Sequence, residues 1–291
     1  MPTRAPAEAT EEFIDAQGAR VRVWRAGDGP PLVVVVDCGD PLELWTEAFE
    51  GFAQEHEVVI VEQPGFGYSD AGPGFDYRWN AHLGALRATV EHLDVSDALA
   101  VGHCVAGTQL QAISTVEPGR FRAAVLAETF PADRYRAMGT GLAMHKVARL
   151  PGIGRAMLAA GGRRGLRRGA RYLLRTLADD PSWVDDEILD RYTAPLRKGH
   201  NRVGGLLHIR RFDGEAGAPA ECAAMPAAYL LGAGGHFRRF QRERTAFAED
   251  HGRHVELLDA AGHFLFAERP AAFVRRCTAM LDALTGEESS E

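Results

Sequence analysis

Val101-Gly102-His103-Cys104-Val105-Ala106-Gly107 decides the fold of this chain, because it joins a predicted strand to a predicted helix through a sharp turn. The apolar run 98–101 supplies the strand, and residues 108–113 begin the helix. Small residues flank Cys104, where bulk would collide in a tight turn. The pattern predicts a nucleophile elbow, with Cys in place of the usual Ser. An inert buried cysteine is the alternative, and the strand–turn–helix context favours the nucleophile.

Composition limits the class of protein. The 291 residues, 46% of them hydrophobic, can bury a large core as one α/β domain, with or without an insertion. A net charge of -7 gives no general attraction to nucleic acid. The four cysteines lack paired or metal-ligand spacing, so we expect no disulfide framework, no metal and no cofactor; they are Cys38, Cys104, Cys222 and Cys277.

No targeting segment is evident in the sequence. Residues 1–10 lack the apolar centre of a signal peptide. No run of about eighteen apolar residues occurs, so we expect no membrane span. The expectation is a soluble cytoplasmic protein whose thiols stay reduced.

Apolar runs alternate with helical segments along most of the chain. This alternation predicts a mainly parallel sheet covered on both faces. Eight strands are expected, at 12–15, 20–24, 32–36, 58–61, 98–101, 122–127, 227–231 and 255–258. The first two form a plausible hairpin, and the others carry the β-branched and apolar residues of buried strands.

The alternation stops in the middle of the chain. Residues 130–219 contain no comparable strand and are rich in Ala, Leu and Arg at helical spacing. A segment this long is too long for a loop, and it predicts an inserted helical lid. The expected core is therefore 11–129 together with 220–285, and 286–291 form a polar, disordered tail.

With these motifs in place, residues 11–285 resemble the α/β-hydrolase fold family, in particular the branch of haloalkane dehalogenases, epoxide hydrolases, carbon–carbon hydrolases and small esterases. The resemblance implies a mainly parallel eight-stranded sheet with helices on both faces and an inserted lid. Cys104 matches the position of the nucleophile. His263 follows the last strand and precedes Pro270, where the family places its catalytic base. A base in reach of the thiol would activate it.

The acid of the expected triad departs from the commonest family pattern. The segment after the penultimate strand, 232–236, contains no carboxylate. Part of the dehalogenase branch places the acid at the end of the strand after the elbow helix, and Glu128 fills that position. Its role would be to accept a hydrogen bond from the His263 ring. Glu128 as a helix cap, or a Cys–His dyad without an acid, remain open.

Acyl transfer also needs donors for a developing oxyanion. We expect one from the backbone N–H of Val105, and the resemblance places the other at the backbone N–H of Asp40. Cys38 stands where the family has a His. A carboxylate at position 40 is unfavourable beside an oxyanion unless it turns away, is protonated or has another role.

Other side chains are candidates for binding a substrate or a partner. His103, Cys38 and His236 are candidate substrate contacts, although His236 also fits a solvated loop. The arginines of the insertion predict either docking of an acidic partner such as coenzyme A or an acyl carrier protein, or a solvated face paired with Asp179, Asp180, Asp185 and Asp186. These arginines are 163, 164, 167, 168, 171 and 175, of which 164, 168, 171 and 175 share a helical face.

The leading hypothesis is covalent acyl transfer through Cys104. The thiol would attack a small-molecule ester, thioester or lactone, and the acyl-thioester enzyme would release to water or to another acceptor, as in a thioesterase, acyltransferase or cyclase. The alternative is a non-covalent lyase or eliminase that uses Cys104, His263 and Glu128 for proton transfer. A non-catalytic ligand binder is less favoured. A dehalogenase or epoxide hydrolase is disfavoured, because both need a carboxylate nucleophile.

Overall fold

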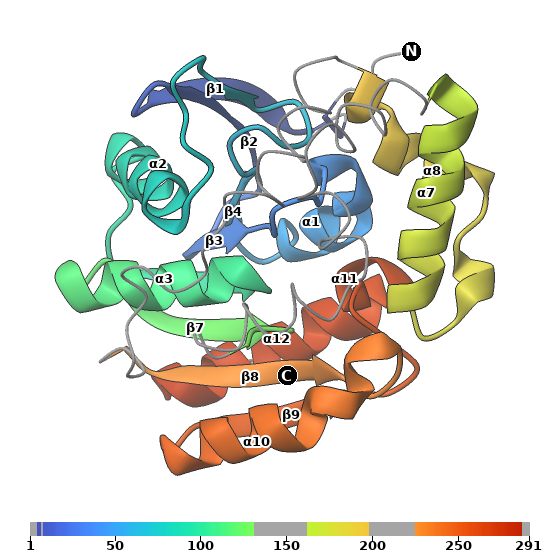
Figure 1. Cartoon of the computed structure of the whole chain (residues 1–291). Helices are drawn as coiled ribbons and strands as arrows, with labels where there is room; N and C mark the ends of the chain where they lie inside the picture. The colour runs from blue at the N-terminus through green and yellow to red at the C-terminus, as the bar shows by residue number, and fades with distance from the viewer. Residues whose placement is uncertain (1–4, 7, 131–161, 198–224, 287–291) are drawn as a thin grey trace.

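A single sheet forms the centre of the computed structural model, which describes residues 5–6, 8–130, 162–197 and 225–286 (Figure 1). Its strands are β1 (Thr10–Ala16), β2 (Ala19–Ala26), β3 (Pro31–Val35), β4 (Glu57–Val61), β5 (Asp70–Ala71), β6 (Ala98–His103), β7 (Phe121–Ala127), β8 (Ala227–Gly232) and β9 (His254–Leu258).

The sheet is mainly parallel, as the sequence predicts. Its order is β1-β2-β4-β3-β6-β7-β8-β9, and all pairs from β4 to β9 are parallel. The hairpin of β1 and β2 is antiparallel, as is the pairing of β2 with β4. All eight predicted strands are present. The ninth, β5, has two residues and pairs with β2, and it is too short to leave an apolar pattern in the sequence.

Helices cover both faces of the sheet. One face packs against α1 (Thr46–Phe52), α11 (Leu265–Glu268) and α12 (Pro270–Thr285), and the other against α2 (Trp79–His92), α3 (Val105–Val116) and α10 (Gln241–Asp250). Strand β3 shows why its sequence is a continuous apolar run. Leu32 and Val34 face the first layer, Val33 and Val35 face the second, and all four are buried. Short 3-10 turns η1 (Leu42–Leu44) and η4 (His236–Phe240) follow β3 and β8.

The described part of the predicted insertion is helical. It contains α7 (Gly162–Leu177), η2 (Pro181–Trp183), α8 (Asp186–Thr193) and η3 (Pro195–Arg197). Helices α7 and α8 pack on each other near α11 (Figure 1). Residues 131–161 and 198–224 lie outside the described residues, so the boundaries 130–219 stay a prediction. The predicted tail lies outside them too, apart from Gly286, the C-cap of α12.

A buried arginine ties the edge of the sheet to the loop after β3. Arg22, on β2, is 1% exposed, and its guanidinium contacts three carboxylates, those of Glu11 at 2.6 Å, Glu43 at 2.8 Å and Glu62 at 3.7 Å. Glu62 also accepts the backbone N–H groups of Leu42, Tyr68 and Ser69. This network fixes the segment in which the candidate donor Asp40 lies.

We predict that Arg22→Met destabilises the protein by about 3–5 kcal/mol, because it leaves the carboxylates of Glu43 and Glu62 buried without their cation. The free energy of unfolding from urea titration measures this. The matched control is Arg20→Met, which removes an exposed guanidinium on the same strand and should cost less than about 1 kcal/mol. Equal losses in the two variants would contradict the role of the buried network.

Candidate active site

The predicted elbow is present at the junction of β6 and α3. Cys104 has φ 52° and ψ −118°, a strained conformation for a residue with a side chain, and it is 5% exposed. The small neighbours are required by close approach. A Cβ on Gly102 would lie 2.6 Å from the Cα of Gly107, and a Cβ on Gly107 would lie 2.0 Å from the Oγ1 of Thr129. The turn therefore excludes larger residues at both positions.

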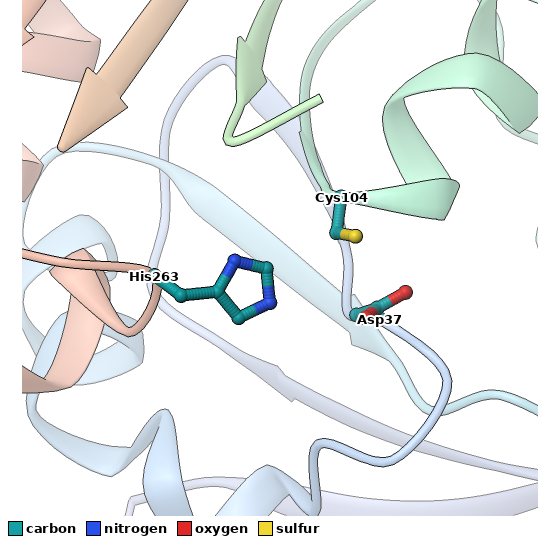
Figure 2. A group of neighbouring side chains, drawn as sticks. All are labelled: Asp37, Cys104 and His263. Atoms are coloured by element: carbon teal, nitrogen blue, oxygen red, sulfur yellow. The ribbon is translucent and has the colours of Figure 1, made fainter. Parts of the chain in front are cut away.

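Side chains from the carboxyl ends of three different strands meet at this elbow. Asp37 follows β3, Cys104 follows β6 and His263 follows β9. One ligand atom of each lies within 4.8 Å of the other two. Figure 2 shows the His263 ring turned towards Cys104 and Asp37. In a parallel sheet the carboxyl ends form one edge, so residues far apart in sequence converge there.

Glu128 holds the His263 ring, in the position that the sequence suggests. Its Oε2 lies 3.4 Å from Nδ1 of His263, while its carboxylate also accepts from Gly232 N at 2.8 Å and Arg244 Nη1 at 3.0 Å. Burial favours the neutral acid, but Arg244, His263 and the backbone N–H of Gly232 together lower the pKa of Glu128 to about 2. The carboxylate is therefore ionised at neutral pH. Its catalytic role stays a prediction.

His263 is poised as a base. Burial lowers its pKa, and the hydrogen bond to Glu128 only partly offsets this, so the ring is neutral at pH 7 and can accept a proton. Its main-chain N–H donates to the carbonyl of Leu177 at 3.0 Å, at the end of α7. The ring packs edge-on against Phe237 at a centroid distance of 4.9 Å. Packing and hydrogen bonds thus fix its orientation.

Cys104 is a neutral thiol in this environment. Burial raises its pKa well above the ordinary value, and the carboxyl groups of Asp37, Asp40 and Glu128 raise it further. A thiolate would form only as His263 removes the proton. The arrangement suits general-base activation during attack better than a standing thiolate.

The two expected oxyanion donors are both directed at Asp37. Val105 N donates to Oδ1 of Asp37 at 3.3 Å, and Asp40 N donates to the main-chain oxygen of Asp37 at 3.2 Å. The second bond closes a turn over residues 37–40. Both N–H groups are therefore engaged in this structure, and their role as oxyanion donors stays a prediction.

The Asp40 side chain has another role, as a partner of His103, which is one of the outcomes that the sequence left open. Its Oδ2 lies 2.8 Å from Nδ1 of His103, whose Nε2 donates to the main-chain oxygen of His263 at 2.9 Å. Burial opposes protonation of His103, but the carboxylates of Asp40 and Asp37 outweigh it and raise the pKa of that ring. His103 and Asp40 are therefore a buried hydrogen-bonded pair in which protonation of the ring is favoured.

The other predicted substrate contacts occupy different positions. Both ring nitrogens of His103 are engaged, so a substrate contact through that ring would have to break one of these bonds. Cys38 is partly exposed in the turn after β3. His236 begins η4, and its ring packs on Phe237, which lies against His263. Substrate binding by these three residues stays a prediction.

Two residues of the site were not predicted. Asp37 opens the segment 37–41 that aligns with the family pattern, but the direction of its side chain could not be read from sequence. Arg244, on α10, is 1% exposed and pairs with Glu128. A charged residue in a helix usually faces solvent. Only its ion pair with the buried Glu128, which the sequence does not show, identifies Arg244 as part of the site.

Asp37, Cys104 and His263 are the one group of described residues that could hold a metal ion. Zinc binds carboxylate, thiolate and imidazole ligands. Glu128 contacts the other ring nitrogen of His263, as a carboxylate often does beside a zinc-bound histidine. The Asp37 carboxyl is already hydrogen-bonded to the Cys104 thiol and to Val105 N–H. The expectation of no metal stays a prediction.

The arginines of α7 are partly paired with α8. Arg167 contacts Asp186 and Asp190, and Arg171 contacts Asp186 at 2.9 Å. These ion pairs support the alternative in which the two arginines lie on a solvated face paired with aspartates. Asp190 is a partner that the sequence analysis did not name. Arg164, Arg168 and Arg175 are exposed.

Comparison with known proteins identifies the family. A family profile described as the alpha/beta hydrolase fold matches residues 38–270. The chain belongs to this family. Among its relatives, Epoxide hydrolase A of Mycobacterium tuberculosis is 27% identical and the alignment covers 96% of this chain and 98% of that protein. The 2-hydroxymuconate semialdehyde hydrolase of a Pseudomonas species is 25% identical over 79% of this α/β hydrolase and 77% of the relative.

Solved structures confirm the fold. The Cif epoxide hydrolase of Acinetobacter nosocomialis has a TM-score of 0.78 at 17% identity, covering 95% of this chain and 90% of that one. A loop variant of a haloalkane dehalogenase from Bradyrhizobium elkanii has a TM-score of 0.74 at 18% identity, with 96% and 98% covered. These likenesses establish the architecture of this hydrolase.

Two further expectations are partly answered by the described residues. None of their helices has both the length and the apolar character needed to cross a membrane. Cys38, Cys104 and Cys277 are outside any disulfide, and Cys222 lies outside the described residues.

The Asp37 carboxyl should make stability depend on pH. Burial and the neighbouring Asp40 raise its pKa from 3.8 to about 7. Between pH 4 and 7 the native state holds a proton that the unfolded state has released, so stability falls as pH rises and then levels off. We predict that Asp37→Asn removes about 1–3 kcal/mol of this loss of stability between pH 4 and 7. This is less than the free energy that corresponds to the whole pKa shift, because Asp37 is partly exposed.

Urea titrations of both proteins from pH 4 to 8 measure the difference. Subtracting the two curves removes the contribution of Glu62, whose pKa is also raised to about 7. Parallel curves would contradict the raised pKa of Asp37.

Proposed function

We propose that this hydrolase acts on an ester, thioester or lactone through an acyl-thioester at Cys104. The observation that carries the proposal is the elbow conformation of Cys104 beside a neutral His263 held by Glu128. This is the order of nucleophile, base and orienting acid that acyl transfer needs. Dehalogenase and epoxide hydrolase activity are not proposed, although relatives carry those names, because the elbow residue is not a carboxylate.

The proposed reaction has two steps. Cys104 Sγ attacks the carbonyl carbon while His263 takes the thiol proton, and the tetrahedral intermediate collapses as the His263 imidazolium gives that proton to the leaving group. Water or another acceptor then attacks the thioester, with His263 removing its proton and returning it to the departing Sγ. Glu128 stabilises the imidazolium in both steps.

The acyl carrier is part of the proposal. Coenzyme A or an acyl carrier protein would present a phosphate-bearing arm, for which the exposed Arg164, Arg168 and Arg175 on α7 offer positive charge. Arg167 and Arg171 are already paired with carboxylates of α8, which supports the alternative of a solvated face.

We predict that 4-nitrophenyl acetate acetylates Cys104, because this activated ester needs little help with its leaving group. Intact-mass spectrometry of the quenched protein should show one added acetyl group, absent from Cys104→Ala. The matched control is Cys277→Ala, which removes a buried thiol on α12 and should keep the adduct. An unmodified wild-type protein, or an adduct that survives Cys104→Ala, would falsify the covalent mechanism.

The role of Glu128 has its own prediction. Glu128→Gln should slow acetylation of Cys104 at least about tenfold, because the imidazolium loses its carboxylate. Stopped-flow release of 4-nitrophenolate measures the rate, and thermal melting checks that the variant is folded. Glu256→Gln, which changes a carboxylate on β9, should leave the rate unchanged. Equal rates in both variants would reduce the site to a Cys104–His263 dyad.

A second candidate function is non-covalent proton transfer by a lyase or eliminase. The observation that favours it is Asp37, whose carboxyl accepts from Val105 N–H in place of an oxyanion. In that case Cys104→Ser would retain most activity while His263→Gln loses it, and no acyl adduct would form on Cys104.

A further inference from the structure

The Asp37 carboxyl accepts the Val105 N–H, the donor that acyl transfer needs for the substrate oxyanion. Its Oδ1 accepts from Val105 N at 3.3 Å, and a hydrogen bond also joins its carboxyl to the Cys104 thiol. Val105 is the first residue of α3, and the first N–H groups of a helix have no partner within it. The carboxyl therefore satisfies a donor that would otherwise face the substrate.

A substrate oxygen and the Asp37 carboxyl compete for this donor. One N–H gives its strongest bond to a single well-aligned acceptor, because a shared N–H bends away from both oxygens and weakens both bonds. An oxyanion beside a carboxylate would also be repelled in a partly buried site. Attack by Cys104 on a carbonyl thus needs Oδ1 to leave Val105 N–H first.

The other backbone donor does not replace it. The N–H of Asp40 is held by the main-chain oxygen of Asp37, in the turn over residues 37–40. The Asp40 side chain is fixed by His103, which keeps this turn in place. Of the two donors, Val105 N–H is therefore the one that movement of the Asp37 side chain can free.

We propose that Asp37 is a positioning residue that covers the Val105 N–H donor, so that Cys104 is acylated only when a substrate carbonyl oxygen displaces the Asp37 carboxyl. This inference rests on the proposed function and goes beyond it. In this proposal, Asp37 selects for carbonyl compounds whose oxygen competes well for the Val105 N–H. No bond to Asp37 forms or breaks in the step.

The test compares two reagents on Cys104. Acetylation by 4-nitrophenyl acetate builds an oxyanion, whereas alkylation by iodoacetamide displaces iodide from a saturated carbon and builds none. The ratio of the two rate constants therefore reports on the oxyanion donor, while a changed thiol pKa moves both rates together. Peptide mass mapping assigns each adduct to Cys104 and separates it from Cys38.

Two substitutions separate the position of the carboxyl from its charge. Asp37→Ala removes the acceptor and frees Val105 N–H, so the ratio of acetylation to alkylation should rise at least about tenfold, within the ~10²–10³ that one such donor contributes. Asp37→Asn removes the charge but keeps an oxygen that accepts from Val105 N–H, so its ratio should stay within about threefold of wild type. Should Asp37→Ala fail to fold, Asp37→Val has a similar shape without an acceptor.

Each outcome decides between the two proposals. Unchanged ratios with both reagents still reacting would overturn the role of Asp37 and leave the acyl-enzyme intact. An equal rise in Asp37→Ala and Asp37→Asn would assign the effect to charge and overturn the covering role. Alkylation without acetylation in every variant would overturn the proposed function itself.

Discussion

The buried pair of His103 and Asp40 holds together the three segments that make the site. The His103 ring sits at the end of β6, immediately before the elbow, and it bonds to the turn after β3 through Asp40 and to the loop after β9 through the carbonyl of His263. Because a carbonyl can only accept, Nε2 must donate, and the second proton lies between Nδ1 and the carboxylate. One histidine ring thus links the elbow, the loop that carries His263 and the turn after β3.

Charge balance explains why the three carboxyl groups around Cys104 behave differently. Asp40 is paired with His103, and Glu128 is paired with Arg244 and with Gly232 N–H. At Asp37, burial and the neighbouring Asp40 outweigh the field of His103 and the hydrogen bonds with Cys38 N–H and the Cys104 thiol. Asp37 therefore binds a proton more readily than an ordinary carboxyl group does.

Much of the fold followed from local patterns, because buried parallel strands carry continuous apolar runs. The elbow was also predictable, since its small residues leave a direct mark in the sequence. The convergence of Cys104, His263 and Glu128 followed from their positions at strand ends. The direction of the Asp37 side chain did not, because it depends on the turn closed by Asp40 N–H. Neither did the inward position of Arg244, which depends on a carboxylate more than a hundred residues earlier in the chain.

The hydrogen bond from His263 N–H to the Leu177 carbonyl links the loop after β9 to the end of α7. Glu268 strengthens the same junction by accepting from Gly262 N and Asp179 N. The predicted insertion is therefore hydrogen-bonded to the residue proposed as the base. Exchange of this helix for that of a relative would therefore have to rebuild these contacts to keep the loop of His263 in place.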